Sequence, residues 1–153
     1  MGRFLVLAAV LCVCLGCKSE PNQVHFILPI GFRGAFAVKP DDSLGIILVN
    51  KDGRYVVRIP ESGLLCVKGL DPFHPYVCTA AFANGSEIWV SKRLDDKPRK
   101  EQNALWDGAT QSWDENGRPV NFFWWFVGTE DEWNASDEVT RYRLGGVPKK
   151  SGD

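Results

Sequence analysis

The chain has 153 residues, of which 44% are hydrophobic and 12% are aromatic, and its formal net charge is −1. These values fit one folded domain with a leader and exclude wholesale disorder, because such a chain can bury a sizeable core. The near balance of 18 basic and 19 acidic side chains gives no electrostatic reason to expect a nucleic-acid partner, and we predict none.

The N-terminal residues 1–16 have the layout of a signal peptide. Arg3 supplies a minimal positive region, an apolar run follows it up to Leu15, and the small residue Gly16 precedes Cys17. The apolar run has about a dozen residues, whereas a membrane-spanning helix needs ~20. We therefore predict a leader that is cleaved rather than a permanent anchor.

The end of this leader, Leu15-Gly16-Cys17, resembles the bacterial lipobox. The resemblance implies that Cys17 receives a diacylglyceryl group and becomes the mature N-terminus. The membrane would then be a partner through the lipid anchor, and the chain would lie at the cell membrane or outer membrane, outside the cytoplasm. Residues 17–23 would form a short tether. Cys14 stands where the lipobox usually has leucine, and the alternative is an ordinary secretory leader with an incidental cysteine.

From Val24 onward, short apolar runs alternate with turn residues. Asp52-Gly53 is the clearest hairpin signal, because both residues tolerate the positive φ angles of a tight turn. Strands at this short spacing predict an all-β domain over residues 24–144, folded as an antiparallel β-sandwich or a partly open barrel. The expected strands are 24–28, 35–38, 45–50, 55–59, 64–68, 76–82, 87–91 and 122–127.

The segment 122–127 is the most apolar part of the chain after the leader. Trp124 and Trp125 must point to opposite faces of a strand, so this strand should be central and covered on both sides. Before it, residues 92–101 read as a charged, solvated excursion, and residues 103–118 read as a loop followed by a turn.

Thr129 and Glu132 have the spacing of a helix capping box, in which the threonine caps the first turn and the glutamate reaches back. We expect one short C-terminal helix from this box through Ser136. A last strand is expected at 139–144, and a flexible tail follows over 145–153.

Two cysteines, Cys66 and Cys78, remain when the leader is removed and Cys17 carries lipid. An even pair in an oxidising compartment favours a disulfide, and the two residues fall on successive predicted strands joined by one loop. We therefore predict a disulfide between Cys66 and Cys78. The alternative is a pair of thiols that only pack.

Three stretches carry a further pattern. They read Phe-Ile-Leu-Pro-Ile-Gly-Phe-Arg-Gly at 26–34, a strand followed by Ile-Pro-Glu-Ser-Gly within 55–63, and Phe-Val-Gly-Thr-Glu-Asp-Glu at 126–132. In this order and spacing they resemble a family of small bacterial lipoproteins with an uncharacterised domain. The resemblance implies an extracytoplasmic β-rich domain without an established activity, so it transfers no functional residue.

The chain has two histidines, His25 and His74, which cannot supply the clustered ligands of a zinc site. Carboxylate clusters fall in predicted turns or at a helix start, where acids are common, and the sequence has no Gly-x-Ser-x-Gly motif. We therefore nominate no catalytic residue, metal site or cofactor, and predict a non-enzymatic binding or structural domain. The alternative is an enzyme with a site of unrecognised type.

Tryptophan is the most distinctive residue type of the chain, with six copies. Trp89 should face outward if its neighbours Ile88 and Val90 face the core. Together with Trp106 or Trp113, it would form an aromatic platform able to stack on an envelope glycan such as peptidoglycan, or on another envelope protein. The alternative is that these rings close the open ends of the sandwich.

Overall fold

The computed structural model describes three segments of the chain, 20–90, 96–115 and 118–136, and gives only the backbone at 107–109, 111–115 and 118–119. The leader, Cys17, the strand expected at 139–144 and the tail expected at 145–153 lie outside these segments. The described elements are nine β-strands, one 3-10 helix and one α-helix. In chain order they are β1 (Asn22–Leu28), β2 (Gly34–Pro40), β3 (Asn50–Lys51), β4 (Arg54–Arg58), β5 (Leu64–Val67), η1 (Asp71–Phe73), β6 (Tyr76–Phe82), β7 (Glu87–Val90), β8 (Ala104–Glu115), β9 (Arg118–Gly128) and α1 (Glu130–Ala135).

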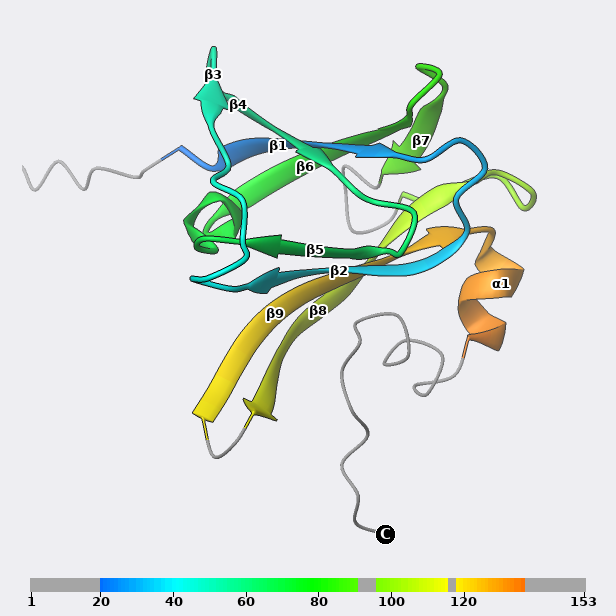
Figure 1. Cartoon of the computed structure of the whole chain (residues 1–153). Coiled ribbons are helices and arrows are strands. Elements are labelled where there is room, and N and C mark those ends of the chain that lie inside the picture. The colour runs from blue at the N-terminus through cyan, green and yellow to red at the C-terminus, as the bar shows by residue number, and fades with distance from the viewer. Residues whose placement is uncertain (1–19, 91–95, 116–117, 137–153) are drawn as a thin grey trace, which may run out of the picture.

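The strands form one curled sheet in the order β3-β4-β1-β6-β7-β8-β9-β2-β5 (Figure 1). The prediction of an all-β domain with one short C-terminal helix is confirmed. The prediction of antiparallel pairing is wrong for four of the described pairs, namely β1 with β4, β1 with β6, β2 with β5 and β7 with β8. Turn residues indicate only pairs of strands that are adjacent in sequence, whereas β1 takes both of its partners from later in the chain.

The curl brings two halves of the sheet face to face, with β4, β1 and β6 in one layer and β5, β2 and β9 in the other (Figure 1). Aromatic rings fill the space between the layers. The ring centroid of Phe26 on β1 lies 4.7 Å from that of Trp125 on β9 and 5.3 Å from that of Phe36 on β2, and all three side chains are buried. This main core therefore joins strands that are not neighbours in the sheet, as in a sandwich.

A second apolar cluster lies on the opposite face of β9. Trp124 belongs to this cluster and is 6% exposed, whereas the next residue, Trp125, belongs to the main core. The ring of Trp133 from α1 stacks on Trp124 with the centroids 6.0 Å apart. The prediction that both faces of this strand are covered is confirmed, and the helix supplies part of the cover.

Two segments differ from their predictions. Residues 45–50 form no strand except at Asn50, and Ile46 makes a single bridge to Val67. This segment passes from the β5 edge of the sheet to the β3 edge, so it does not run alongside either strand. Residues 104–115, predicted as loop and turn, form β8 because they pair with β9 in a long antiparallel hairpin.

The directions of the strands distinguish two ends of the molecule. The parallel strands β1, β4 and β6 begin at one end, where β2 and β5 finish (Figure 1). There the backbone N–H of Asn22 donates to the carbonyl of Pro75 at 2.9 Å, and Gln23 pairs with Arg54. We call this the tether end, because β1 follows the predicted tether. The opposite end, with the turn after β1 and helix α1, is the far end.

The structure holds no bond between Cys66 and Cys78, so the predicted disulfide is not confirmed. Cys66 lies on the edge strand β5 beside Lys39, whereas Cys78 lies on β6 in the other layer. Cys78 packs against the main core. Cys66 points away from it, because its neighbours Leu65 and Val67 are the residues of β5 that fill that core.

Candidate functional site

The outer face of the sheet, on the side away from the main core, carries an open depression of about 660 Å³. It lies over β1, β4, β6 and β7. One aromatic ring and several groups that donate or accept hydrogen bonds line it, which is the mixture expected at a site for a polar ligand. These side chains are His25, Arg54, Thr79, Glu87, Trp89 and Asp96.

The pairing of β1 with β6 brings a histidine against a threonine in this depression. His25 and Thr79 face each other in the register, and His25 Nδ1 lies 2.8 Å from Thr79 Oγ1, so the two side chains share a hydrogen bond. Partial burial, and then the positive charge of Arg54, lower the pKa of His25 below its ordinary value. The imidazole is therefore neutral at pH 7 and offers a hydrogen-bonding ring rather than a charge.

Trp89 lies on β7 and lines the same depression. Its neighbour Ile88 is 4% exposed in the main core and Val90 packs against that core, so alternation along the strand turns Trp89 to the outer face. The backbone N–H of Trp89 donates to the carbonyl of Asn103 at 3.1 Å, which holds β7 beside the start of β8. The ring is half-buried, so part of it remains open to a ligand.

The other two tryptophans nominated for an aromatic platform are placed differently from Trp89. The Trp106 ring stacks on that of Trp133 with centroids 5.8 Å apart and an interplanar angle of 6°. Its Nε1–H donates to the carbonyl of Gly128 at 3.0 Å, so Trp106 packs with the second apolar cluster. The side chain of Trp113 lies outside the described part of the chain. Among the nominated tryptophans whose side chains the structure describes, Trp89 is therefore the one that lines the depression.

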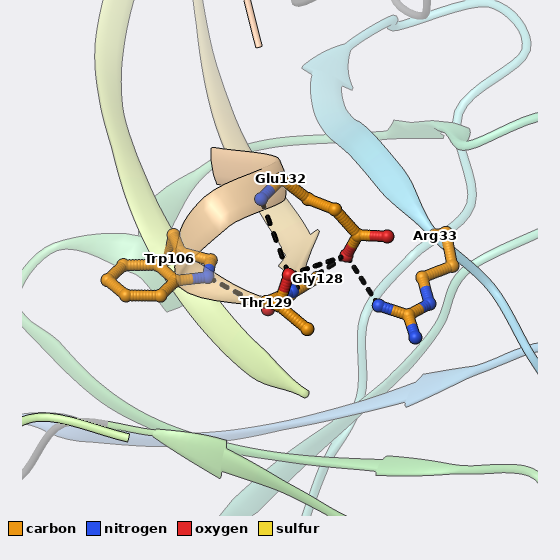
Figure 2. A network of polar contacts seen from close by, with 5 residues as sticks. All are labelled: Arg33, Trp106, Gly128, Thr129 and Glu132. Carbon is orange, nitrogen blue, oxygen red and sulfur yellow. Dashed lines mark hydrogen bonds and ion pairs between the residues drawn. The ribbon is translucent and has the colours of Figure 1, made fainter. Parts of the chain in front are cut away.

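A polar network joins α1 to the turn after β1 (Figure 2). Thr129 Oγ1 accepts the backbone N–H of Glu132 at 3.3 Å, and Glu132 Oε2 accepts the backbone N–H of Thr129 at 2.8 Å, which completes the predicted capping box. Arg33 forms an ion pair with the same carboxylate oxygen. The hydrogen bond from the Thr129 backbone, assisted by the charge of Arg33, lowers the pKa of Glu132. The ionised carboxylate thus holds the helix against the turn.

The stretches that carry the lipoprotein resemblance build close contacts at the far end. The first and third stretches are joined by the ion pair of Arg33 with Glu132. In the second stretch, Gly63 has a φ of +74°, which favours glycine, and a Cβ there would lie 3.1 Å from the carbonyl oxygen of Ala35 and 3.4 Å from the ring of Phe32. The ion pair and the close approach at Gly63 both hold turns of the far end together, so the role of these residues is structural.

Within the segments that the structure describes, no three side chains of histidine, cysteine, aspartate or glutamate are grouped so that they could hold a metal ion. Among the same residues, no helix has both the length and the apolar character required to cross a bilayer. The groups gathered in the depression can hydrogen-bond, carry charge and stack on a ring.

The fold is similar to that of a solved structure, the crystal structure of a "Putative Lipoprotein from Bacillus anthracis". The two chains are 15% identical, the TM-score is 0.51, and the match covers 87% of this chain and 85% of that chain. At this identity the likeness establishes the fold, and it confirms at that level the expected resemblance to β-rich lipoproteins. No family model matches the chain, and no curated protein matches it.

Sequence patterns indicate Trp89 but miss its surroundings. Alternation along β1 and β6 puts His25 and Thr79 on outer faces, yet 54 residues separate them and nothing local shows that their strands are neighbours. Arg54 and Glu87 reach the depression for the same reason, through the order of strands in the sheet.

Proposed function

We propose that this protein is a lipoprotein of the cell envelope, anchored by a lipid on Cys17, with its β domain outside the cytoplasm. The leader ending in Leu15-Gly16-Cys17 supports the anchor. The fold likeness to a protein named as a lipoprotein supports the class. The domain acts by binding a ligand rather than by catalysis.

The observation that carries the binding role is the depression on the outer face of the sheet. It combines a partly open indole ring with the hydrogen-bonded pair of His25 and Thr79 and the charged side chains of Arg54 and Glu87. These groups are positioned by four strands of a rigid sheet, so little order has to be gained when a ligand binds.

An envelope polysaccharide is the ligand class that this depression favours. An indole face stacks on the C–H face of a sugar ring, while hydroxyl, imidazole, guanidinium and carboxylate groups bind sugar hydroxyls. Another envelope protein is the second candidate ligand, since partly open tryptophan rings also anchor protein interfaces.

Mass spectrometry of the protein purified from native membranes tests the anchor. The expected N-terminal peptide begins at Cys17 and carries the mass of a diacylglyceryl group. A chain that still begins at Met1, with Cys17 unmodified, would contradict the proposal.

A pull-down of the purified protein on envelope polysaccharides, including peptidoglycan, tests the ligand class. Trp89→Ala should reduce retention about tenfold or more, because a central tryptophan contributes ~2 kcal/mol or more to a binding site. Val77→Ala is the matched control, since Val77 is 45% exposed on the outer face of β6 and does not line the depression. Equal retention of wild type and Trp89→Ala would remove the depression as the glycan site.

A further inference from the structure

The tether end carries an exposed apolar segment, residues 44–49, with the sequence Leu-Gly-Ile-Ile-Leu-Val. The segment contains no charged residue. Four aliphatic side chains of this segment are exposed, whereas Leu48 packs against the main core. Exposed aliphatic side chains gathered in one short segment mark a binding surface rather than the ordinary scatter of single apolar residues. Its exposed fractions are 82% for Leu44, 51% for Ile46, 70% for Ile47 and 71% for Val49.

The segment is held in this exposed position by its backbone. The N–H of Ile46 donates to the carbonyl of Cys66 at 3.0 Å, and the N–H of Lys68 donates to the carbonyl of Ile46 at 2.8 Å. Asp41 Oδ1 accepts the backbone N–H of Leu44 at 2.8 Å. The aliphatic side chains are therefore presented by an ordered backbone, which lowers the entropy cost of binding.

The segment also lies beside the point where the chain leaves for its lipid. Val24 pairs with Tyr55, and Tyr55 pairs with Asn50, so Asn50 is two strands, or about 10 Å, from β1. Cys17 precedes Asn22 by five residues, which span at most about 17 Å when extended. A lipid on Cys17 thus keeps the tether end at the bilayer surface.

We propose that the exposed side chains of Leu44, Ile46, Ile47 and Val49 insert into the membrane interface, as a second contact beside the lipid on Cys17. This inference rests on the proposed lipid anchor. The bilayer is the occupant because the tether brings it to this end of the domain. Insertion of a few ångströms, within the ~5–10 Å of interfacial apolar segments, orients the domain with its far end away from the membrane.

Photocrosslinking of the full mature lipoprotein tests this contact. The protein is reconstituted into vesicles of phosphatidylethanolamine and phosphatidylglycerol that contain a phospholipid with a diazirine on its acyl chain. After illumination, mass spectrometry should locate acyl adducts on residues 44–49. Ile30 provides an internal control, since it is 69% exposed but lies in the turn at the far end, and it should carry no adduct.

A double variant, Ile46→Asn with Ile47→Asn, should lower the adduct yield on the segment to the level at Ile30. Ile30→Asn is the matched control and should leave the yield unchanged. The wild-type adduct map needs no substitution, so the test stands even where a variant folds poorly.

The outcomes separate the two proposals. A lipidated Cys17 with no adducts on 44–49 would overturn the inference and leave the anchor intact. An unmodified Cys17 would overturn the proposed anchor itself. Adducts on 44–49 in the lipidated protein support both.

Discussion

Gly45 shows how a single residue directs the course of a segment. A Cβ at this position would lie 2.3 Å from the carbonyl oxygen of Asp41 and 2.4 Å from the carbonyl carbon of Val67. Both neighbours are backbone atoms, which cannot rotate away as a side chain can. Glycine is therefore required at this position by the close approach of three backbone segments.

Replacing Gly45 with alanine should lower the free energy of unfolding by ~1–3 kcal/mol or more, because backbone must move to admit the methyl group. Urea unfolding of the purified variant measures the loss. Leu44→Ala is the matched control, since Leu44 is 82% exposed, and it should change stability by less than about 0.5 kcal/mol. Equal unfolding midpoints for the two variants would contradict this account of Gly45.

Elements with a strong local signal could be predicted from the sequence. The capping box at Thr129 and Glu132 predicts α1, and the two-sided apolar pattern at 122–127 predicts a strand covered on both faces. The turn at Asp52 and Gly53 has the positive φ values, 54° and 81°, that its residues favour. In each case the sequence pattern that predicts the element lies within a few residues.

Elements defined by distant partners could not be predicted in this way. The branched residues of 45–50 favour a strand locally, but the segment crosses between two sheet edges and leaves Ile46, Ile47 and Val49 exposed. The strand β8 has a polar sequence that includes Gly108, and its pairing with β9 defines it. Local composition therefore misleads where the sheet order decides the structure.

Helix α1 should depend on its N-terminal cap, because it has only six residues and no fully buried side chain. Thr129→Ala removes the oxygen that accepts from Glu132 and should cost about 1 kcal/mol. The near-UV circular dichroism should also weaken as Trp133 loosens from Trp106.

The conservative variant Thr129→Ser keeps the hydroxyl and should retain most of the stability and the near-UV signal. Urea unfolding and near-UV spectra of the two variants give the comparison. If serine and alanine behave alike, the cap does not hold the helix.

At the scale of the whole molecule, the order of the strands decides what the candidate site contains. His25, Arg54 and Thr79 meet only because β1 lies between β4 and β6, with both neighbours parallel to it. Sequence patterns assign each residue to an outer face but contain no signal for these neighbours. Trp89 could be nominated because its own alternation turns it outward, whereas Trp106 could not be excluded without knowing that α1 covers it.

The same strand order leads to a prediction about the two cysteines of the domain. The strand order argues against a link between Cys66 and Cys78, because the two residues lie in different layers and only Cys78 packs against the main core. We therefore expect both cysteines to remain thiols even in an oxidising compartment. Alkylation of the unfolded protein without reductant, followed by mass spectrometry, should label both residues. Labelling that appears only after reduction, together with a peptide pair linked through these cysteines, would show that β5 and β6 lie close enough to be bridged, which contradicts their placement in separate layers.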